Sequence, residues 1–580
     1  MSVEISTFST HPPERRTVVL KFGGSVLARE DDIATAVHEC YRWVREGWSV
    51  VAVVSAIGDT TDRLVAAASS YGHDPSSHAA AALVATGETV SAAHLWLGCD
   101  RAGIDAVSAD PREIGLRVDG PATDARPVAV DEAALRALLH RHAVVVVPGF
   151  FGVDGAGRIA LLGRGGSDLT AVLVAHALGA RCRLVKDVPG LFEHDPARPG
   201  PFARRYATIT FADAERLDGV ILQRKALAYA MRHAFPFEVG AAAQAEATLV
   251  GAQETRFAGE RTHARLRVAL LGFGVVGRGV WQHLVRQRQA FEVVGAAVRS
   301  PKRHSDALAP RLLKRDAVAL AAEDTSDVVV ETIGGLTVAR AAVEAALRRG
   351  ADVVTANKTL LAHHGAELAR LAEESGARIY ASAAVGGAAP ILETAARLRE
   401  QGVARVEAVL NGTTNFVLGA QARGVSFDDA VAEAQALGFA ESDPGADLSG
   451  ADAEEKLRIL CRAAFGCDPD LCTTHGLDPH ATVRGSERLV ARAILIDGSL
   501  VASIAVEPLR PTHPLLSAQG VWNQAVFTLH SGESVQVAGK GAGRFPTAEA
   551  VLADLFDAYR SRAERRHAER PHAQLAGGIA

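Results

Sequence analysis

The stretch RVALLGFGVVGRGVW, residues 267–281, determines the fold of the second half of this 580-residue chain. An apolar run of strand type leads directly into Gly272, Gly274 and Gly277, where a stretch of helical character begins. In such a GxGxxG pattern the first glycine permits a tight turn, the second lets the backbone approach a pyrophosphate, and the third lets the helix pack on the strand. We therefore expect a Rossmann domain that binds a dinucleotide. The alternative is a glycine-rich turn of the same sequence pattern that binds no ligand.

The next apolar strand, FEVVGAAV at 291–298, indicates which dinucleotide to expect. An acidic residue at the end of this strand would hold the ribose 2′-hydroxyl of NAD. Instead the strand is followed by Arg299, Lys302 and Arg303. Cations at this place suit a 2′-phosphate, so we favour NADP over NAD. The alternative is that the three charged side chains only keep a surface loop in contact with water.

The alternation of strands and helices extends over the whole chain. Apolar runs such as TVVLKF (17–22), AVVVVPGF (143–150) and DVVVETIG (327–334) alternate with alanine-rich stretches of helical period. This order predicts an α/β fold with parallel sheets covered by helices. The pattern restarts at Arg265 after the polar stretch 253–263, so we expect two α/β halves joined by a linker.

Composition excludes several classes of function. With 48% hydrophobic and 22% charged residues the chain is neither disordered nor fibrous. The 62 Lys and Arg against 67 Asp and Glu give a net charge of −5, which provides no basic field for nucleic acid or a membrane, so we expect small-molecule partners. No signal peptide or membrane-spanning run is evident, and the six cysteines form no CxxC pair. We expect a cytoplasmic protein without a zinc site.

Further motifs of the second half, in chain order, carry a family resemblance. They are VVVETIGG (328–335), VVTANKTLLA (353–362), YASAAVGGAAPI (380–391), LNGTTNFVL (410–418), LGFAESDPGADLSGADAEEKLRIL (437–460), HPLLSAQGVWNQAVF (513–527) and GKGAGRFPTAEAVLADL (539–555). Residues 265–560 resemble homoserine dehydrogenase, and the block before Lys456 is the most specific element. The resemblance implies reversible reduction of aspartate 4-semialdehyde to homoserine with a nicotinamide cofactor, in threonine and methionine biosynthesis. Another NADP oxidoreductase with a related aldehyde substrate is a weaker alternative.

Two residues of that block suit proton transfer. Hydride addition to an aldehyde builds negative charge on oxygen, so the site needs a positioned cation or proton donor. Asp452 and Lys456 are four apart in a stretch of helical character and share one helix face. Spacing alone favours an ordinary surface pair, whereas the resemblance makes both residues catalytic. It also assigns Lys358 a place beside the reacting group, the alternative being a solvated loop lysine.

The resemblance also implies binding residues. Glu441 and Asp447 would hold the substrate ammonium group, and Asn411, Gly412, Thr413 and Thr414 would line the crevice. The expected cofactor residues are Gly272, Phe273, Gly274, Val275, Val276, Gly277, Arg299, Lys302, Thr332, Gly334, Lys358 and Gly541. Many relatives have a glutamate where this chain has Ser382, so a sodium or potassium ion on the carbonyls of Val385 and Gly387 is an open alternative.

The first half carries a different set of motifs. KFGGSVL at 21–27 follows a strand, and its glycines let backbone amides approach a phosphate that Lys21 would neutralise. It lacks the spacing of a Walker A loop. The later motifs are VVSAIGDTTDRL (53–64), ATGETVSA (85–92), PGFFGVDGAGRIALLGRGGSDLTAVLVA (148–175) and KDVPGLFEHDP (186–196). Together they resemble the aspartokinase branch of the amino-acid kinase family, which implies transfer of the ATP γ-phosphoryl group to aspartate with magnesium.

The matched positions imply roles in the first half. Lys21, Gly23, Gly24 and Ser25 would cradle phosphates, Asp187 would contact nucleotide, Ser55 and Glu88 would face aspartate, and Arg164 and Asp168 would lie near its carboxylates or the ATP. Three departures weaken the match: KFGGSVL is one residue shorter than the usual KFGGTSV pattern, Lys186 replaces a usual threonine, and LQRKALAYA (222–230) differs from the usual KVLHPR-type segment. A non-catalytic structural or binding module is therefore the alternative to an active kinase.

The domain order follows from both resemblances. We expect an amino-acid-kinase-like αβα sandwich at 15–250, a linker at 251–264, a Rossmann domain at 265–395 completed by about 535–560, an α+β catalytic and dimerisation domain at 396–534 and a flexible tail at 561–580. The linker has no room for the regulatory domains usual between fused enzymes of these kinds, so threonine feedback is not expected. The segment 513–527 resembles the part around which the family dimerises, which predicts a homodimer or higher homo-oligomer.

Overall fold

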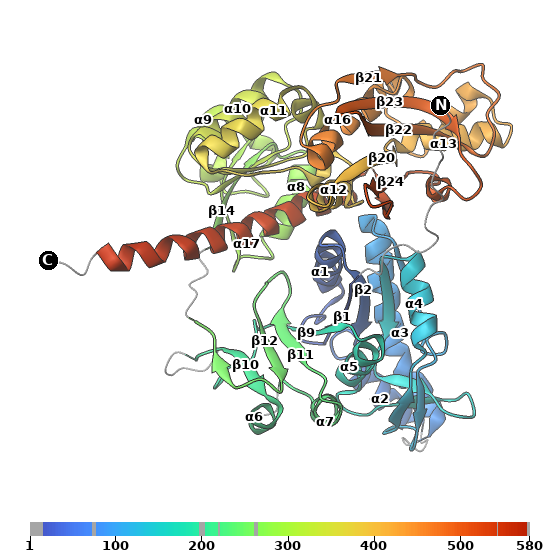
Figure 1. Ribbon diagram of the computed structural model, residues 1–580. Helices are drawn as coiled ribbons and strands as arrows, with labels where there is room; N and C mark the ends of the chain where they lie inside the picture. Colours follow the sequence, from blue (N-terminus) through green and yellow to red (C-terminus); the bar gives the residue numbers. More distant parts are fainter. Residues whose placement is uncertain are drawn as a thin grey trace. The chain divides into compact units, whose positions relative to one another are not determined.

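The chain, described by a computed structural model, divides into two compact units (Figure 1). The structure describes residues 16–71, 77–196, 203–217, 221–259, 265–541 and 543–576. The first unit is Arg15–Thr262, and the second unit contains His263–Ala580. Among the described helices, none combines the length and the apolar character needed to cross a membrane.

A nine-stranded sheet forms the centre of the first unit, in the order β13-β10-β12-β11-β9-β1-β2-β6-β3. Its strands are β1 (Thr17–Phe22), β2 (Ser49–Val54), β3 (Ala106–Ser108), β6 (Val144–Pro148), β9 (Arg181–Lys186), β10 (Tyr206–Thr210), β11 (Phe237–Ala241), β12 (Ala247–Gly251) and β13 (Arg256–Phe257). The neighbours β9, β1, β2 and β6 run parallel, so their carboxyl ends meet at one edge. Every residue of β2 is buried, as expected of a parallel strand covered on both faces.

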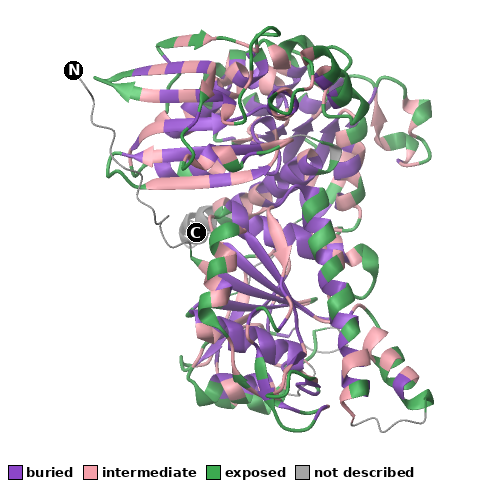
Figure 2. Cartoon of the chain, turned by 90° about the vertical axis from the view of Figure 1, so that its right-hand side faces the viewer, coloured by how far each residue is buried: buried purple, intermediate pink, exposed green. Residues whose placement is uncertain are grey.

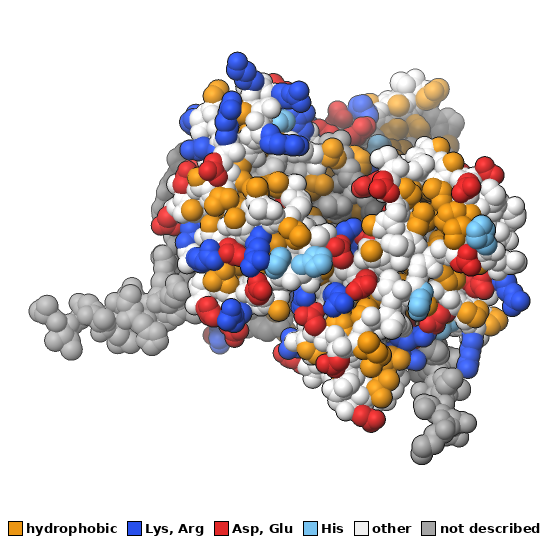
Figure 3. Space-filling view, turned by 90° about the horizontal axis from the view of Figure 1, so that it is seen from above, with side chains coloured by type: hydrophobic (Ala, Val, Ile, Leu, Met, Phe, Trp, Pro, Cys, Tyr) orange, Lys and Arg blue, Asp and Glu red, His pale blue; other side chains and the backbone are white. Residues whose placement is uncertain are grey.

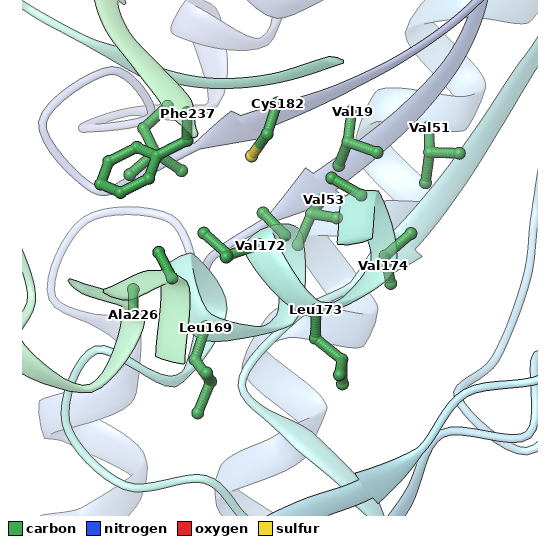
Figure 4. Close-up of a cluster of buried hydrophobic side chains, with 14 of the residues drawn as sticks. Val19, Val51, Val53, Leu169, Val172, Leu173, Val174, Cys182, Ala226 and Phe237 are labelled. Carbon is green, nitrogen blue, oxygen red and sulfur yellow. The ribbon is translucent and has the colours of Figure 1, made fainter. Parts of the chain in front are cut away.

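Helices complete the αβα sandwich predicted for this unit. They are α1 (Ile33–Arg45), α2 (Thr60–Ser70), α3 (His78–Ala102), α4 (Glu132–Arg141), α5 (Gly166–Leu178), α6 (Phe211–Arg216) and α7 (Arg224–Arg232), with a small sheet of β5 (Arg126–Ala129), β4 (Arg117–Asp119), β7 (Phe151–Val153) and β8 (Ile159–Leu161). Figure 4 shows Val172 and Val174 of α5 beside the strand residues Val19 and Val53. This packing fixes the start of α5 at the carboxyl edge of β1.

The segment 251–264, predicted to be a linker, contains a strand. β13 pairs antiparallel with β10, and the ring of Phe257 stacks on Tyr206 at 4.6 Å between centroids. The guanidinium of Arg204 lies 3.8 Å from the centroid of the same ring. These contacts extend the sheet of the first unit to Phe257, and the next strand begins at Leu266.

The second unit begins with a parallel six-stranded sheet in the order β16-β15-β14-β17-β18-β19. The strands are β14 (Leu266–Leu271), β15 (Phe291–Ala297), β16 (Leu313–Lys314), β17 (Val328–Glu331), β18 (Asp352–Thr355) and β19 (Ile379–Tyr380), and the helices are α8 (Val275–Leu284), α9 (Ala317–Ala322), α10 (Thr337–Arg348) and α11 (Lys358–Ser375). Strand order and the loop between β14 and α8 confirm the predicted Rossmann domain.

A mixed sheet follows, in the order β21-β23-β22-β20-β24-β25. Its strands are β20 (Val403–Val409), β21 (Leu471–Thr474), β22 (Glu487–Ile496), β23 (Ser499–Pro508), β24 (Trp522–Leu529) and β25 (Ser534–Lys540), and its helices are α12 (Ile391–Arg399), α13 (Gly412–Ala422), α14 (Phe427–Ala436), α15 (Gly445–Leu448) and α16 (Ala451–Phe465). Along β23, buried residues that pack toward the helices alternate with half-buried ones (Figure 2). One face of this sheet is therefore only partly covered.

The last helix, α17 (Arg544–Ala576), replaces most of the flexible tail expected at 561–580. It packs against α8, and Arg562 and Arg565 both bind the buried carboxylate of Asp352 at the start of β18. Arg565 also donates to the carbonyl oxygen of Gly376 at 3.0 Å. These tertiary contacts stabilise a helix that its charged sequence alone does not predict. Residues 577–580 lie outside the described part.

Charged side chains of both signs lie on the face of the molecule seen in Figure 3. Lys and Arg side chains are interspersed there with Asp and Glu. This mixture of signs agrees with the net charge of −5.

Candidate active sites

The loop between β14 and α8 has the geometry of a dinucleotide site. Gly272 has φ of +99°, and a Cβ there would lie 2.9 Å from the carbonyl oxygen of Thr332. A Cβ on Gly277 would lie 2.3 Å from the carbonyl oxygen of Gly272, so this glycine permits the close packing of α8. At Gly274, by contrast, no neighbouring atom of the described residues lies within 4 Å of a Cβ. The open side of Gly274 at the start of α8 fits a pyrophosphate.

Three cations follow β15 at the place where the ribose would lie. Arg299, Lys302 and Arg303 are all exposed, and no carboxylate within the described ranges forms an ion pair with them. Exposed cations at this position are able to bind an anionic group of a dinucleotide.

The buried carboxylate of Glu331 holds the loop after β17. One oxygen accepts hydrogen bonds from the backbone amides of Ile333 and Gly334 at 2.8 and 3.0 Å, and the other accepts from the hydroxyl of Thr355 at 2.6 Å. Thr332 donates its hydroxyl to the carbonyl oxygen of Leu271 at 3.1 Å. The ends of β14, β17 and β18 are therefore tied together beside the glycine loop. Sequence reasoning missed Glu331, whose only signal is an acid directly after the apolar run VVV.

A second site in this unit centres on Asp452 of α16. Its carboxylate is 3% exposed, and its Oδ2 lies 2.8 Å from Nζ of Lys456. Lys358, at the start of α11, donates a hydrogen bond to the other carboxylate oxygen. Nζ of Lys456 also donates to the carbonyl oxygen of Leu410 at 2.7 Å. The predicted pair Asp452 and Lys456 thus shares its carboxylate with Lys358, 94 residues away in sequence.

Electrostatics favour the charged forms of Asp452 and Lys358. Burial alone would raise the pKa of Asp452, but Lys456 and Lys358 outweigh it and lower that pKa to about 2. Burial alone would lower the pKa of Lys358, yet the carboxylate of Asp452 outweighs it and raises that pKa. Two ammonium groups around one carboxylate leave an excess positive charge for an oxygen that becomes negative.

Asn411 joins this site to the substrate residues expected from sequence. Its Nδ2 donates to Asp447 and to Asp452, both at 2.7 Å, and its Oδ1 caps α13 by accepting from the amide of Thr414 at 2.8 Å. We call Asp452, Lys358, Lys456 and Asn411 the Asp452 cluster. The contact between Asn411 and Asp452 was not expected from the sequence.

Helices α11 and α16 hold the two lysines in register. Thr359 donates its hydroxyl at 3.1 Å to Glu455, which lies on α16 between Asp452 and Lys456. Two turns further, the guanidinium of Arg462 donates to the carbonyl oxygen of Ala362 at 2.8 Å. The Rossmann and mixed-sheet parts of the second unit therefore meet along a bonded helix pair at the site.

Other predicted residues of the second unit lie around this site. Glu441 is exposed between α14 and α15, and its carbonyl oxygen accepts from Gln435 at 3.0 Å, so its side chain is not part of the Asp452 cluster. A Cβ on Gly541 would lie 2.1 Å from the side chain of Asn523. Ser382 donates its backbone amide and its hydroxyl to the carboxylate of Asp554 on α17.

Four more predicted residues have separate positions. Thr413 donates its hydroxyl to the carbonyl oxygen of Phe439 at 2.8 Å. A Cβ on Gly412 would lie 3.0 Å from Cα of Val521, and one on Gly387 would lie 2.6 Å from the carbonyl oxygen of Gly541. Val385 is buried. In the described part of the chain, no group of three or more His, Cys, Asp and Glu side chains is placed to hold a metal ion.

The first unit has its own buried charge cluster at the carboxyl ends of β1 and β9. Asp168, in the first turn of α5, lies 2.7 Å from Nζ of Lys21 and 3.1 Å from Nζ of Lys186. Burial alone would raise the pKa of Asp168, but the two lysines outweigh it and lower that pKa. We call these three residues the Asp168 cluster. Sequence reasoning placed Lys21 and Asp168 at the site but treated Lys186 only as a departure.

Glu88 of α3 lies close to this cluster. One of its oxygens accepts from the amide of Ala56 at 3.2 Å. The other is buried and has no hydrogen-bond partner in the part of the chain that the structure describes. Burial raises the pKa of Glu88 to about 7, although the charge of Lys21 lowers it. An orphaned buried oxygen of this kind suits a charged ligand group.

Most of the remaining residues predicted for the first unit are exposed, whereas Gly23 is buried. A Cβ on Gly23 would lie 2.6 Å from Nζ of Lys21, so the bare glycine makes room for that ammonium group. The exposed residues are Gly24, Ser25, Arg164 and Asp187, and Ser55 is half-buried. The structure therefore brings Lys21, Asp168 and Glu88 together and leaves the others around the carboxyl edge of the sheet or in its loops.

The glycine loop and the Asp452 cluster define the second unit as a Rossmann-fold dehydrogenase. Comparison with known proteins agrees: residues 272–382 match the NAD-binding domain of homoserine dehydrogenase, 390–556 match homoserine dehydrogenase, and 16–236 match the amino acid kinase family. The homoserine dehydrogenase of Corynebacterium glutamicum is 37% identical over 320 residues, which cover 51% of this chain and 72% of the relative. That of Synechocystis sp. is 32% identical, covering 50% and 73%.

Among solved structures, a homoserine dehydrogenase from Thiobacillus denitrificans matches with a TM-score of 0.49 and 32% identity, covering 54% of this chain and 76% of that one. From the sequence matches, the chain belongs to the homoserine dehydrogenase family, with a domain of the amino acid kinase family ahead of the dehydrogenase. Its second unit is a homoserine dehydrogenase, which interconverts aspartate 4-semialdehyde and homoserine. The resemblance of the second half to homoserine dehydrogenase is confirmed, and that of the first half is confirmed at the level of the amino acid kinase family.

Proposed function

We propose that the chain is a bifunctional enzyme, an NADP-preferring homoserine dehydrogenase fused to an active aspartokinase. The observation that carries the dehydrogenase mechanism is the buried carboxylate of Asp452 between two lysines. The glycine loop, Thr332 and the loop before Gly335 would hold the cofactor, which supplies the hydride. The residues of this chain must then bind the aldehyde and neutralise its oxygen.

Lys456 is the proton donor in this proposal. An ammonium group has three protons, and Asp452 and the carbonyl oxygen of Leu410 accept two of them. The third remains for the oxygen of the substrate. Lys358 polarises the same oxygen, and Asp452 orients both lysines without titrating near neutral pH, because its pKa is about 2.

The variant Lys456→Ala tests this mechanism. We expect kcat to fall by about 10²–10⁴-fold, the usual contribution of a positioned general acid, while NADPH binding is kept. Arg458→Ala is the matched control, because Arg458 lies on the same helix but pairs with Glu454 at 2.9 Å. Near-normal turnover of a folded Lys456→Ala protein would refute the assignment.

The preference for NADP is assigned to the exposed cations after β15. In the variant Arg299→Ala/Lys302→Ala we expect kcat/KM for NADPH to fall about tenfold or more relative to NADH, because charge-assisted bonds to phosphate are lost. Arg348→Ala, which removes a surface partner of Glu344, is the control. An equal loss with both cofactors would mean that the two cations only support the loop.

The aspartokinase proposal is supported by the intact Asp168 cluster. Burying a carboxylate with two lysines costs several kcal/mol of desolvation, which a purely structural module does not need. ATP-dependent formation of aspartyl hydroxamate tests the activity, with Lys21→Ala as the variant that should abolish it. Absence of hydroxamate with the unaltered chain would favour a non-catalytic module. Magnesium would accompany the ATP, and a sodium or potassium ion at Val385 and Gly387 stays a prediction.

A homodimer is the last part of the proposal. The partly covered face of the mixed sheet has half-buried residues, among them Val501, Ser503 and Ala505 on β23. Light scattering would measure the mass in solution, and the variant Ala505→Arg should shift it toward the monomer. A monomeric mass of 60.8 kDa for the unaltered chain would contradict the dimer.

A further inference from the structure

The Asp168 cluster contains one more cation than the motifs of the first half predict. Strand β9 runs parallel to β1 with Lys21 opposite Leu184 and Phe22 opposite Val185. Lys186 is therefore the next residue in line, beside Gly23. Because side chains alternate along a strand, Lys186 projects to the same face as Leu184 and Lys21. The sheet register thus brings both ammonium groups to Asp168.

The charges of the cluster do not balance. Asp168 carries one negative charge. Burial alone would raise its pKa, but the two lysines lower that pKa and so favour the ionised carboxylate. It lies in the first turn of α5, whose positive end already stabilises a carboxylate. A second buried lysine is therefore more than Asp168 needs. The side chain of Lys186 is only 10% exposed, and the loop with Gly23 and Gly24, where a phosphate is expected, follows directly after β1.

The other lysine of this region is engaged elsewhere. Lys225 lies in α7, within the segment that departs from the usual KVLHPR type. Its Nζ binds the carboxylate of Asp124 and the carbonyl oxygen of Leu162. These partners hold Lys225 away from Asp168 and leave Lys21 and Lys186 as the cations of the cluster.

We propose that Lys186 is a second phosphate-binding lysine of the first unit and acts beside Lys21 on the phosphates of ATP, with Asp168 positioning both. This role deepens the proposed aspartokinase function and rests on it. During transfer, the bond from the γ-phosphorus to the bridging oxygen of ADP breaks while a carboxylate oxygen of the acceptor bonds to phosphorus. Both lysines donate hydrogen bonds to phosphate oxygens, and the transfer moves no proton from either of them.

Three variants of the full chain test this role: Lys186→Met, Lys186→Arg and the control Lys225→Met. Binding of ATP with magnesium is measured by calorimetry, and hydroxamate formation is measured with aspartate. We expect Lys186→Met to weaken ATP binding about tenfold, the effect of losing one charge-assisted phosphate contact, and to lower hydroxamate formation further. Lys186→Arg keeps the pair with Asp168 and should restore part of the ATP affinity. Lys225→Met should leave both within about twofold.

The possible outcomes separate the two proposals. Unchanged ATP affinity and hydroxamate formation in Lys186→Met would overturn the role of Lys186 and leave the aspartokinase function intact. ATP binding that depends on Lys186, in a chain that makes no hydroxamate, would support the phosphate contact and overturn the aspartokinase function. If the unaltered chain binds no ATP, both fail. If Lys186→Met unfolds the first unit, the variant Lys186→Arg decides the question. The role of Lys186 then requires that Lys186→Arg stay folded and bind ATP more tightly than Lys21→Arg does. Any other result would overturn the role.

Discussion

At the scale of single residues, Glu331 connects the core of the Rossmann sheet to the loop beside the glycines. In the variant Glu331→Gln, the backbone amides of Ile333 and Gly334 would face either the NH₂ group or the neutral, weaker oxygen acceptor of the glutamine. This change costs about 1–3 kcal/mol of loop stability. We expect KM for NADPH to rise about tenfold and kcat to change less, because the loop supports binding and does not touch the transferred proton.

Steady-state kinetics with NADPH as the varied substrate measure this split. Glu367→Gln is the control, because Glu367 is an exposed residue of α11 that pairs with Arg340 of α10. A fall in kcat with an unchanged KM would contradict a positioning role for Glu331.

Glu88 gives a prediction for the first unit. Burial raises its pKa to about 7, so its carboxylate is about half protonated at neutral pH. If the ionised form binds the ammonium group of aspartate, KM for aspartate falls as pH rises through 7 and levels off about one pH unit above it. We expect Glu88→Gln to have a high KM that is independent of pH between 6 and 8. The same pH profile in both proteins would show that another group titrates.

Spacing in the sequence was sufficient for some site residues and insufficient for others. The GxGxxG pattern and the four-residue step from Asp452 to Lys456 depend on local geometry, which the sequence determines directly. The contact of Lys358 with Asp452 joins helices 94 residues apart, and only the family resemblance indicated it. Burial of Glu331 and the approach of Lys186 to Asp168 depend on tertiary packing, so no local pattern predicted them.

At the scale of elements, a buried network joins α1 to the turn between β11 and β12. Glu39 of α1 accepts hydrogen bonds from Arg42 at 2.6 Å and from the backbone amide of Ala243 at 2.7 Å. Arg183 of β9 donates to carbonyl oxygens of the same turn, including that of Gln244 at 2.6 Å. The turn between β11 and β12 is therefore held to α1 and β9 by charged groups that are almost completely buried.

Removal of the charge of Glu39 should destabilise the first unit. Burial alone would raise its pKa, but Arg42 and Arg183 outweigh it and lower that pKa to about 2 from 4.5. At 1.36 kcal/mol per unit, the ionised carboxylate contributes about 3 kcal/mol. This stability is present above pH 4.5 and is lost as pH falls toward 2. We expect Glu39→Gln to lower the free energy of unfolding at pH 7 by about 3–5 kcal/mol, because two arginines lose their buried partner.

Urea unfolding at pH 7 and pH 3 measures both effects. Glu132→Gln is the control, because Glu132 pairs with Arg136 on the surface of α4 and should change stability by less than about 0.5 kcal/mol. A Glu39→Gln protein as stable as the control at pH 7 would mean that the network contributes little.

Elements with strong periodicity were predicted well, and those stabilised by distant contacts were not. Central strands such as β2, β6 and β17 are nearly continuous apolar runs, which identify them without tertiary information. β13 has two exposed residues and exists because β10 pairs with it. The end of α17 has a charged sequence and is stabilised by the bonds of Arg562 and Arg565 to Asp352.

At the scale of the whole molecule, the two units are connected by a short segment. β13 ends at Phe257 and β14 begins at Leu266, which leaves no space for a further domain between them. Each unit also closes its own hydrophobic core, the first around Val19 and Val172 and the second around Leu457 and Val353. A ligand that binds to one unit therefore stabilises that unit directly.

This organisation predicts that two ligands act on two separate unfolding transitions of the full chain. A ligand at 100 times its Kd adds about 2.7 kcal/mol to the unit that binds it, which corresponds to a rise in Tm of about 5 °C or more for a unit of this size. Scanning calorimetry should show NADPH raising one transition and ATP with magnesium raising the other. L-Threonine, for which no regulatory domain lies between the units, should move neither transition and inhibit neither activity. A single transition that both nucleotides raise equally, or a threonine-dependent shift, would contradict this organisation.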